Sequence, residues 1–347
     1  MKASFVSTTS ISQALRYSQG RMQSELVSAQ KEAVTQRIAD RGLALGAKTA
    51  QSINIQRDTD RLNAIIDSNG LVSSRLSATQ TGLSQIASSA QSLLSTLTTA
   101  ASNGDSASMV TAAANATLSS LGSVLNTSLD GKYLFSGVNS DVKPFNGFDD
   151  GSAGKAAFDT AFETYFGFSQ SSAQAENITA AQIGDFIATA VEPLFMGSGW
   201  SAMSNASDQG VTSRIALNET TQTSVTANAE GIRRIAMASA MVQNLMSGNL
   251  GEAAKTAVIS TGLSMTGTAI ADLTKLQSST GIIEQRVSEA SERLTSQVDL
   301  FEKLVAKTEG VDPAAAATRV SDLVNQIETS FALTARIQQL KLLNFLS

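Results

Sequence analysis

The fold is decided by residues 62–97, LNAIIDSNGLVSSRLSATQTGLSQIASSAQSLLSTL. Apolar or small side chains recur there in alternating steps of three and four residues, which is the heptad spacing of a coiled-coil helix. The positions are Leu62, Ile65, Asn69, Val72, Leu76, Thr79, Leu83, Ile86, Ala90, Leu93 and Leu97. One helix of this length extends about 54 Å and needs a partner helix along its stripe.

A second stripe of the same kind lies near the other end of the chain. It consists of Met265, Ala269, Leu273, Leu276, Thr280, Ile283, Val287, Ala290, Leu294, Val298, Phe301 and Val305. The two stripes can cover one another, so we expect the two halves of the chain to form one long antiparallel coiled-coil rod. On the pattern alone, any antiparallel helical bundle is an alternative.

The first stripe belongs to a segment with very few charges. Between Arg75 and Lys132 the only charged residues are Asp105 and Asp130. The face opposite the stripe therefore carries Ser, Thr, Gln, Asn and Ala, where a water-facing helix usually carries Glu and Lys. Such a neutral surface favours close packing between subunits, because no unpaired charge has to be desolvated. A solvated face rich in Ser and Thr is the alternative.

Both ends of the chain show helical spacing of apolar residues. Asp312 and Pro313 have the residue types of an N-cap and a first helical position, so a last helix is predicted from there. Its extreme end, KLLNFLS, is unusually apolar for a chain terminus. We predict that these apolar positions form an assembly interface; they are Ile11, Leu15, Met22, Leu26, Leu323, Ile327, Phe331, Ile337, Leu340, Leu343, Phe345 and Leu346.

The middle of the chain differs in kind from the two rods. Twelve of the seventeen aromatic residues fall between Tyr133 and Trp200, which indicates a compact insert with an aromatic core. The segment from Tyr133 to Val142 predicts a β-hairpin, with Tyr133 to Phe135 as a strand and Gly137 to Asp141 as the turn. Residues 213–228 alternate enough to predict a second strand pair.

The composition removes whole classes of chemistry. The chain has no Cys and no His, which excludes disulfides, thiolate nucleophiles, imidazole bases and the usual zinc ligands. Its net charge of −5 gives no basic footprint for nucleic acid. No stretch is long and apolar enough to predict a membrane span or a cleavable signal peptide. We therefore predict a protein that is not an enzyme and has no cofactor and no metal.

These observations predict a mainly α-helical protein with an inserted α+β or β domain. We expect five segments: an N-terminal inner-core helix at 1–45, the first half of the rod at 46–130, the hairpin and outer insert at 131–228, the second half of the rod at 229–309, and a C-terminal inner-core helix at 310–347.

The hairpin segment at residues 131–145, GKYLFSGVNSDVKPF, resembles a signature of the flagellin-like family of hook-associated proteins. The matching positions are Gly131, Tyr133, Leu134, Phe135, Ser136, Gly137, Pro144 and Phe145. The run from Val311 to Leu346 is similar to the C-terminal domain of the same family. The resemblance covers about 1–145 and 228–347. The sequence RIADRGLALG at residues 37–46 replaces a motif common in flagellins. With its tyrosine-containing hairpin and its small, single insert, the chain looks more like the hook–filament junction proteins.

The resemblance implies a structural part of the bacterial flagellum, found outside the cell. Family members are exported unfolded through the flagellar type III channel without a cleavable signal, and their terminal helices order on assembly. A junction protein would form a ring with copies of itself, between subunits of the hook-associated protein 1 type and the first flagellin subunits. A flagellar export chaperone is a further expected partner, whereas nucleic acid and membrane are not. The alternatives are flagellin itself and a soluble coiled-coil signalling or adhesion protein.

Overall fold

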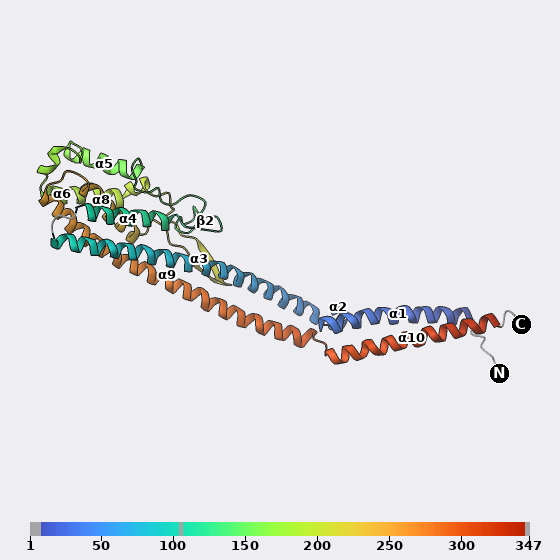
Figure 1. The fold of residues 1–347 in the computed structure, drawn as a ribbon. Helices are drawn as coiled ribbons and strands as arrows, with labels where there is room; N and C mark the ends of the chain where they lie inside the picture. The colour runs from blue at the N-terminus through green and yellow to red at the C-terminus, as the bar shows by residue number, and fades with distance from the viewer. Residues whose placement is uncertain (1–7, 104–106, 344–347) are drawn as a thin grey trace. The chain divides into compact units, whose positions relative to one another are not determined.

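The computed structural model describes residues 8–103 and 107–343 and contains two compact units (Figure 1). The terminal unit combines Met1–Asn63 with Leu294–Ser347, and the central unit is Ala64–Arg293. Two long helices, α3 (Lys48–Asn103) and α9 (Glu252–Glu309), contribute residues to both units. The five predicted segments are not tested by this division, which falls inside these two helices.

The terminal unit pairs the two ends of the chain. Helix α1 (Thr8–Thr35) lies antiparallel beside α10 (Pro313–Leu343). Gln19 Nε2 donates to Thr334 Oγ1 at 3.3 Å, and Arg319 lies 3.9 Å from Glu32. Asp312 caps α10 as predicted, because its carboxylate accepts from the amide of Ala314 at 2.8 Å.

The central unit is organised by the antiparallel pair of α3 and α9. The two predicted stripes face one another, and most of their members are buried. Polar side chains cross the seam: Gln80 Nε2 donates to the carbonyl of Gln277 at 2.8 Å, and Asn69 Nδ2 donates to Ser291 Oγ at 3.1 Å. The predicted pairing of the sequence-distant halves is confirmed.

Two further helices cover the pair and complete a helical bundle. Helix α4 (Ala107–Leu125) packs against α8 (Glu230–Met246). Helix α8 is buried along almost its whole length, and its apolar residues join those of α3, α4 and α9 in one hydrophobic cluster. The uncharged segment after Arg75 therefore contains both the buried stripe of α3 and helix α4, which packs against α8.

A β-hairpin is present, but it lies before the predicted one, with Tyr133 on its second strand. Strands β1 (Ser128–Leu129) and β2 (Lys132–Tyr133) pair across Asp130 and Gly131, which have φ angles of 52° and 74°. Two positive φ values and an Asp-Gly sequence are typical of a tight hairpin turn. The chain also turns at Gly137 to Asp141 as predicted, where the amide of Val142 donates to the carbonyl of Asn139 at 2.9 Å, but no strand pair flanks that turn.

The return strand predicted at Val142 is absent because the residues after β2 have other partners. The amide of Ala227 donates to the carbonyl of Phe135 at 2.7 Å, and the amide of Ser207 donates to the carbonyl of Ser136 at 3.0 Å. The amide of Tyr133 does bond to the predicted turn, with the carbonyl of Ser140 as its acceptor at 2.8 Å.

The second predicted strand pair is confirmed. Strands β3 (Thr212–Ala216) and β4 (Glu219–Gln222) are antiparallel. Ile215 is buried against Val72 and Leu76 of α3 and Val287 of α9. Asn69 Nδ2 also donates to the carbonyl of Ile215 at 2.9 Å, so this hairpin is fastened to the coiled-coil pair.

The insert is mostly helical and has an aromatic core. Its elements are α5 (Ala153–Phe166), η1 (Ala173–Asn177), α6 (Ala180–Phe186), η2 (Ile187–Val191), α7 (Glu192–Met196) and η3 (Ser198–Ala202). Phe162 and Phe186 meet edge to face with centroids 5.4 Å apart. Trp200 Nε1 donates to Asn228 Oδ1 at 2.7 Å, which joins the end of the insert to the segment before α8.

Two glycines of α3 provide a test of the packing. A Cβ added at Gly82 would lie 2.9 Å from Val124 Cγ1 and 3.1 Å from Phe135 Cζ, whereas one added at Gly70 would meet nothing within 4 Å. Replacing Gly82 with Ala should destabilise the protein by about 1–3 kcal/mol through overpacking. Replacing Gly70 with Ala should stabilise it by about 0.5–1 kcal/mol through helix propensity. Urea unfolding followed by circular dichroism measures both; equal effects would contradict the close contact of α3 with Val124 of α4 and with Phe135.

Candidate assembly surfaces

The terminal unit leaves large apolar side chains in contact with solvent. Tyr17 is 79% exposed, Val34 is 83% exposed and Phe331 is 51% exposed. Within the described part of α1 and α10, the buried apolar side chains are those of Ala29, Ala316 and Leu323. A helix pair with so little buried area gains little stability from its own packing. Exposed apolar area of this kind favours burial against other subunits.

The predicted interface residues divide into two groups. Leu15, Met22, Leu26 and Ile327 are partly buried and Leu323 is buried, on the sides where α1 and α10 meet. Ile11 and Phe331 are exposed. The side chains of Ile337, Leu340 and Leu343, and the residues Phe345 and Leu346, lie outside the description. Part of the predicted stripe thus packs within the chain, and its role in assembly stays a prediction.

The sequence reasoning missed other exposed apolar residues. Val27 and Val34 lie seven residues apart on one flank of α1, and Tyr17 and Leu333 are also exposed. The seven-residue step between the two valines is the one signal that could have found them. Beside them, Met22 and Leu333 line a groove of about 400 Å³ between α1 and α10.

A buried carboxylate stands where the terminal helices join α3 and α9. The short helix α2 (Arg41–Leu45) follows α1, and the amide of Ile38 donates to the carbonyl of Glu309 at 2.9 Å. The Glu309 side chain is 0% exposed. Its Oε1 accepts hydrogen bonds from Ser52 Oγ and, at 3.4 Å, from Arg41 Nη1. Its Oε2 has no hydrogen-bond partner among the described residues.

The chain crosses this joint twice, and the two crossings bond to each other. The amide of Val311 donates to the carbonyl of Gln36 at 3.0 Å, and Arg37 and Gly310 form an antiparallel bridge. Gln36 has a φ of 55°, which is uncommon for a residue with a side chain. The Glu309 joint, meaning Glu309 with Arg41 and Ser52, therefore fixes the path of both segments.

Some of the hydroxyl groups on the neutral face of α3 are hydrogen-bonded within the helix. Several exposed hydroxyls donate to the carbonyl four residues earlier in the same helix; they are Thr81, Ser92, Thr98, Thr99 and Ser102. A neighbouring subunit that covered these groups would leave no hydroxyl donor unsatisfied, so little would be lost on desolvation.

The hairpin motif is a packing element. Leu134, Phe135, Pro144 and Phe145 are buried, Tyr133 is half-buried, and Gly131 is exposed in the turn. Gly137 has a φ of 65°, and a Cβ there would lie 2.5 Å from the carbonyl oxygen of Gln209. The motif residues thus hold the end of α4 against residues 204–227.

Metal binding, hydropathy and pKa values bear on what the described residues can do chemically. Among them, no three acidic side chains come close enough to hold a metal ion. No described helix combines the length and hydropathy of a bilayer span. Burial lowers the pKa of Arg233, while the carboxylates of Asp208 and Glu230 oppose that shift. Arg233 Nε donates to the carbonyl of Phe195 at 2.7 Å, so its role is to fasten α8 to the insert.

Comparison with known protein families matches both ends of the chain. Residues 6–140 match the bacterial flagellin N-terminal helical region, and residues 263–346 match the bacterial flagellin C-terminal helical region. The chain belongs to the flagellin-like family. It is therefore a flagellar structural protein, located outside the cell. A search of curated proteins gave no significant match.

A solved structure shows the same fold. It is a protein from Vibrio parahaemolyticus, provisionally described as a flagellar hook-associated protein. The match has a TM-score of 0.52 at 12% identity, and it covers 76% of this chain and 97% of that one. The likeness extends over nearly the whole of the other protein, so the two share their architecture.

The Glu309 joint can be tested by removing one partner. Replacing Arg41 with Met leaves the buried carboxylate without its cation and should cost about 1–3 kcal/mol of local stability. Hydrogen exchange should rise at amides 36–47 and 306–312 and stay unchanged in α8. Replacing Arg57 with Met is the matched control, since Arg57 is an exposed cation of the same unit. Equal exchange in both variants would show that the ion pair does not hold the joint.

Proposed function

We propose that this protein is a hook-associated junction protein, which connects the hook side of the flagellum to the first flagellin subunits of the filament. The observation that carries the proposal is the fold shared with a chain described as hook-associated, of which 97% is covered. Two features of the sequence support it: a single insert between the rod halves, and residues 37–46 in place of the motif common in flagellins.

The terminal unit supplies the assembly surface in this proposal. Copies of the chain form a ring by packing α1 and α10 against their neighbours, which buries Tyr17, Val34 and Phe331. Contacts along the flagellar axis are head to tail, with subunits of the hook-associated protein 1 type on one side and flagellin on the other. Before assembly, the apolar stripe of α10 is the segment that an export chaperone would cover.

Flagellin itself is the second candidate, because both matching family regions are flagellin regions. The two candidates differ in how the subunit polymerises. Flagellin subunits polymerise without limit, whereas a junction protein stops after it has formed one layer.

Electron microscopy of cells that lack the gene separates these functions. We expect bare hooks, with monomeric flagellin shed into the medium and detected by immunoblot. Loss of all flagellin would identify this chain as the filament subunit. Normal filaments would contradict both the junction function and a role as the main filament subunit.

A surface variant tests the assembly interface directly. Replacing Tyr17 and Phe331 with Ser removes exposed apolar area, so the monomer should keep its helical content and unfolding midpoint. Incorporation at the hook should fall at least tenfold, because one buried aromatic side chain contributes roughly 1.5–3 kcal/mol. The control replaces the exposed polar residues Gln30 with Ser and Asp322 with Asn. Normal incorporation of the Tyr17 and Phe331 variant, measured by immunogold labelling of hooks, would remove these residues from the interface.

A further inference from the structure

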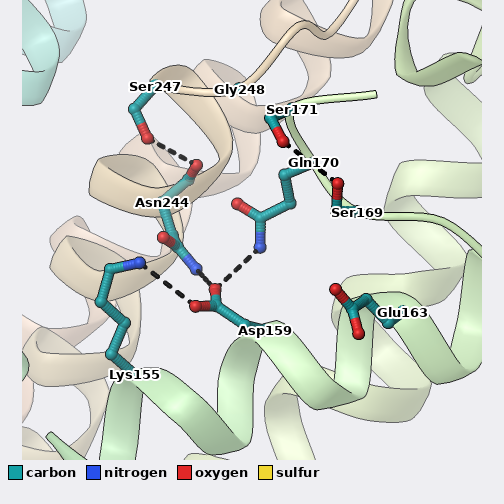
Figure 2. A pocket seen from close by; sticks show the side chains of 9 residues that line it. All are labelled: Lys155, Asp159, Glu163, Ser169, Gln170, Ser171, Asn244, Ser247 and Gly248. Atoms are coloured by element: carbon teal, nitrogen blue, oxygen red, sulfur yellow. Dashed lines mark hydrogen bonds and ion pairs between the residues drawn. The ribbon is translucent and has the colours of Figure 1, made fainter. Parts of the chain in front are cut away.

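A polar cavity in the insert has no role in the assembly just described. It has a volume of about 240 Å³ and lies between α5, the loop at residues 169–171 and the C-terminal end of α8 (Figure 2). Lys155, Asp159 and Glu163 approach it from one face of α5, at intervals of four residues. Its volume is well above the share of about 30 Å³ that one water molecule takes in the liquid.

The Asp159 carboxylate accepts hydrogen bonds from three of the side chains that line the cavity. Its Oδ1 accepts from Asn244 Nδ2 at 2.8 Å and from Gln170 Nε2 at 3.2 Å, and its Oδ2 accepts from Lys155 Nζ at 3.2 Å. Because both amide nitrogens are turned toward Asp159, the amide oxygens of Gln170 and Asn244 are left as acceptors. Asn244 is only 3% exposed and lines the cavity.

The backbone around the cavity is fixed before any ligand arrives. The amide of Asn249 donates to the carbonyl of Gln170 at 3.0 Å, and Asn249 Nδ2 donates to the carbonyl of Ser171 at 2.6 Å. A Cβ at Gly248 would lie 3.0 Å from the carbonyl oxygen of Gln170, so the glycine permits this close approach. The loop is therefore held against the end of α8.

The carboxylate and amide oxygens still free in the cavity are acceptors, and the local charge is negative. Figure 2 shows the Glu163 carboxylate turned toward the loop, and it has no partner among the described side chains. The C-terminal end of α8 adds a partial negative charge of about half a unit. Lys155 does not reverse the sign, because its ammonium group is shared between Asp159 at 3.2 Å and Asp150 at 3.6 Å.

We propose that this cavity binds an organic cation that carries several N–H donors, an ammonium or guanidinium group. Glu163 supplies the charge, and the amide oxygens of Gln170 and Asn244 accept the remaining N–H groups. A phosphate or carboxylate ligand would meet Glu163 without a free cation to offset it. A guanidinium group fits the planar amide and carboxylate acceptors better than a bare metal ion, for which the described residues gather no three acidic ligands.

The test is an NMR titration of the full chain with L-arginine, and L-citrulline is its neutral isostere. We expect saturable shifts at amides 159–171 and 244–249 with arginine at millimolar concentration, and none with citrulline. Replacing Glu163 with Gln should weaken arginine binding by about tenfold, as the loss of one charge-assisted hydrogen bond predicts. Replacing Glu192, an exposed acid elsewhere in the insert, with Gln should change nothing.

Three outcomes would overturn the proposal: equal shifts with arginine and citrulline, equal affinity in the Glu163 and Glu192 variants, or saturation by Ca²⁺ in the absence of any response to arginine. A second measurement identifies the source of the cation once arginine binding is seen. If the Glu163 variant also loses self-association in sedimentation experiments, an Arg or Lys side chain of a second copy fills the cavity. If its self-association is unchanged, the ligand is a free small cation.

Discussion

The antiparallel pairing of α3 with α9 is the interaction on which the rest of the central unit depends. Each helix presents a half-apolar stripe that has no other partner of equal length, so neither half of the chain can bury its stripe alone. Asn69 sits within this stripe and donates to both Ser291 and the carbonyl of Ile215. A shift of one heptad would break both bonds, and the buried amide would then carry an unsatisfied donor. Asn69 thus sets both the register of the helix pair and the position of the β3–β4 hairpin.

The terminal unit follows the opposite principle. Its helices pair through a few small or partly buried residues and keep Tyr17, Val34 and Phe331 in solvent. Next to these helices stands the Glu309 joint, in which one buried carboxylate connects α2, α3 and α9. Firm connection and weak lateral packing suit a segment that completes its packing with neighbouring subunits, as we propose.

Much of the helical fold could be predicted from the sequence, because heptad spacing is visible within one helix and indicates that the helix packs against a partner helix. The stripes of α3 and α9, the cap at Asp312 and the strands around Ile215 all depend on periods or residue types that are visible in the sequence. The hairpin itself could not be placed from Gly137, because positive φ values occur both there and at Asp130 and Gly131, and only the second pair connects two strands. Gly137 packs closely against the distant Gln209 backbone, a contact that the sequence does not show. The helices of the insert and its polar cavity could not be predicted, because Asp159 meets Asn244 across 85 residues of chain.

The chain's one tryptophan lies in the central unit, so tryptophan fluorescence reports on that unit. Trp200 packs against Phe145 and Phe195 with centroids 6.0 and 6.3 Å apart, and the Arg233 guanidinium lies 5.7 Å from its ring. Its emission therefore reports the aromatic core of the insert and is blind to α1 and α10. The terminal unit holds a single tyrosine, Tyr17, and that ring is exposed. Tyrosine emission is shared between the units, because Tyr133 and Tyr165 lie in the central one. Trp200 thus gives the central unit an intrinsic fluorescence signal of its own, which needs no labelling.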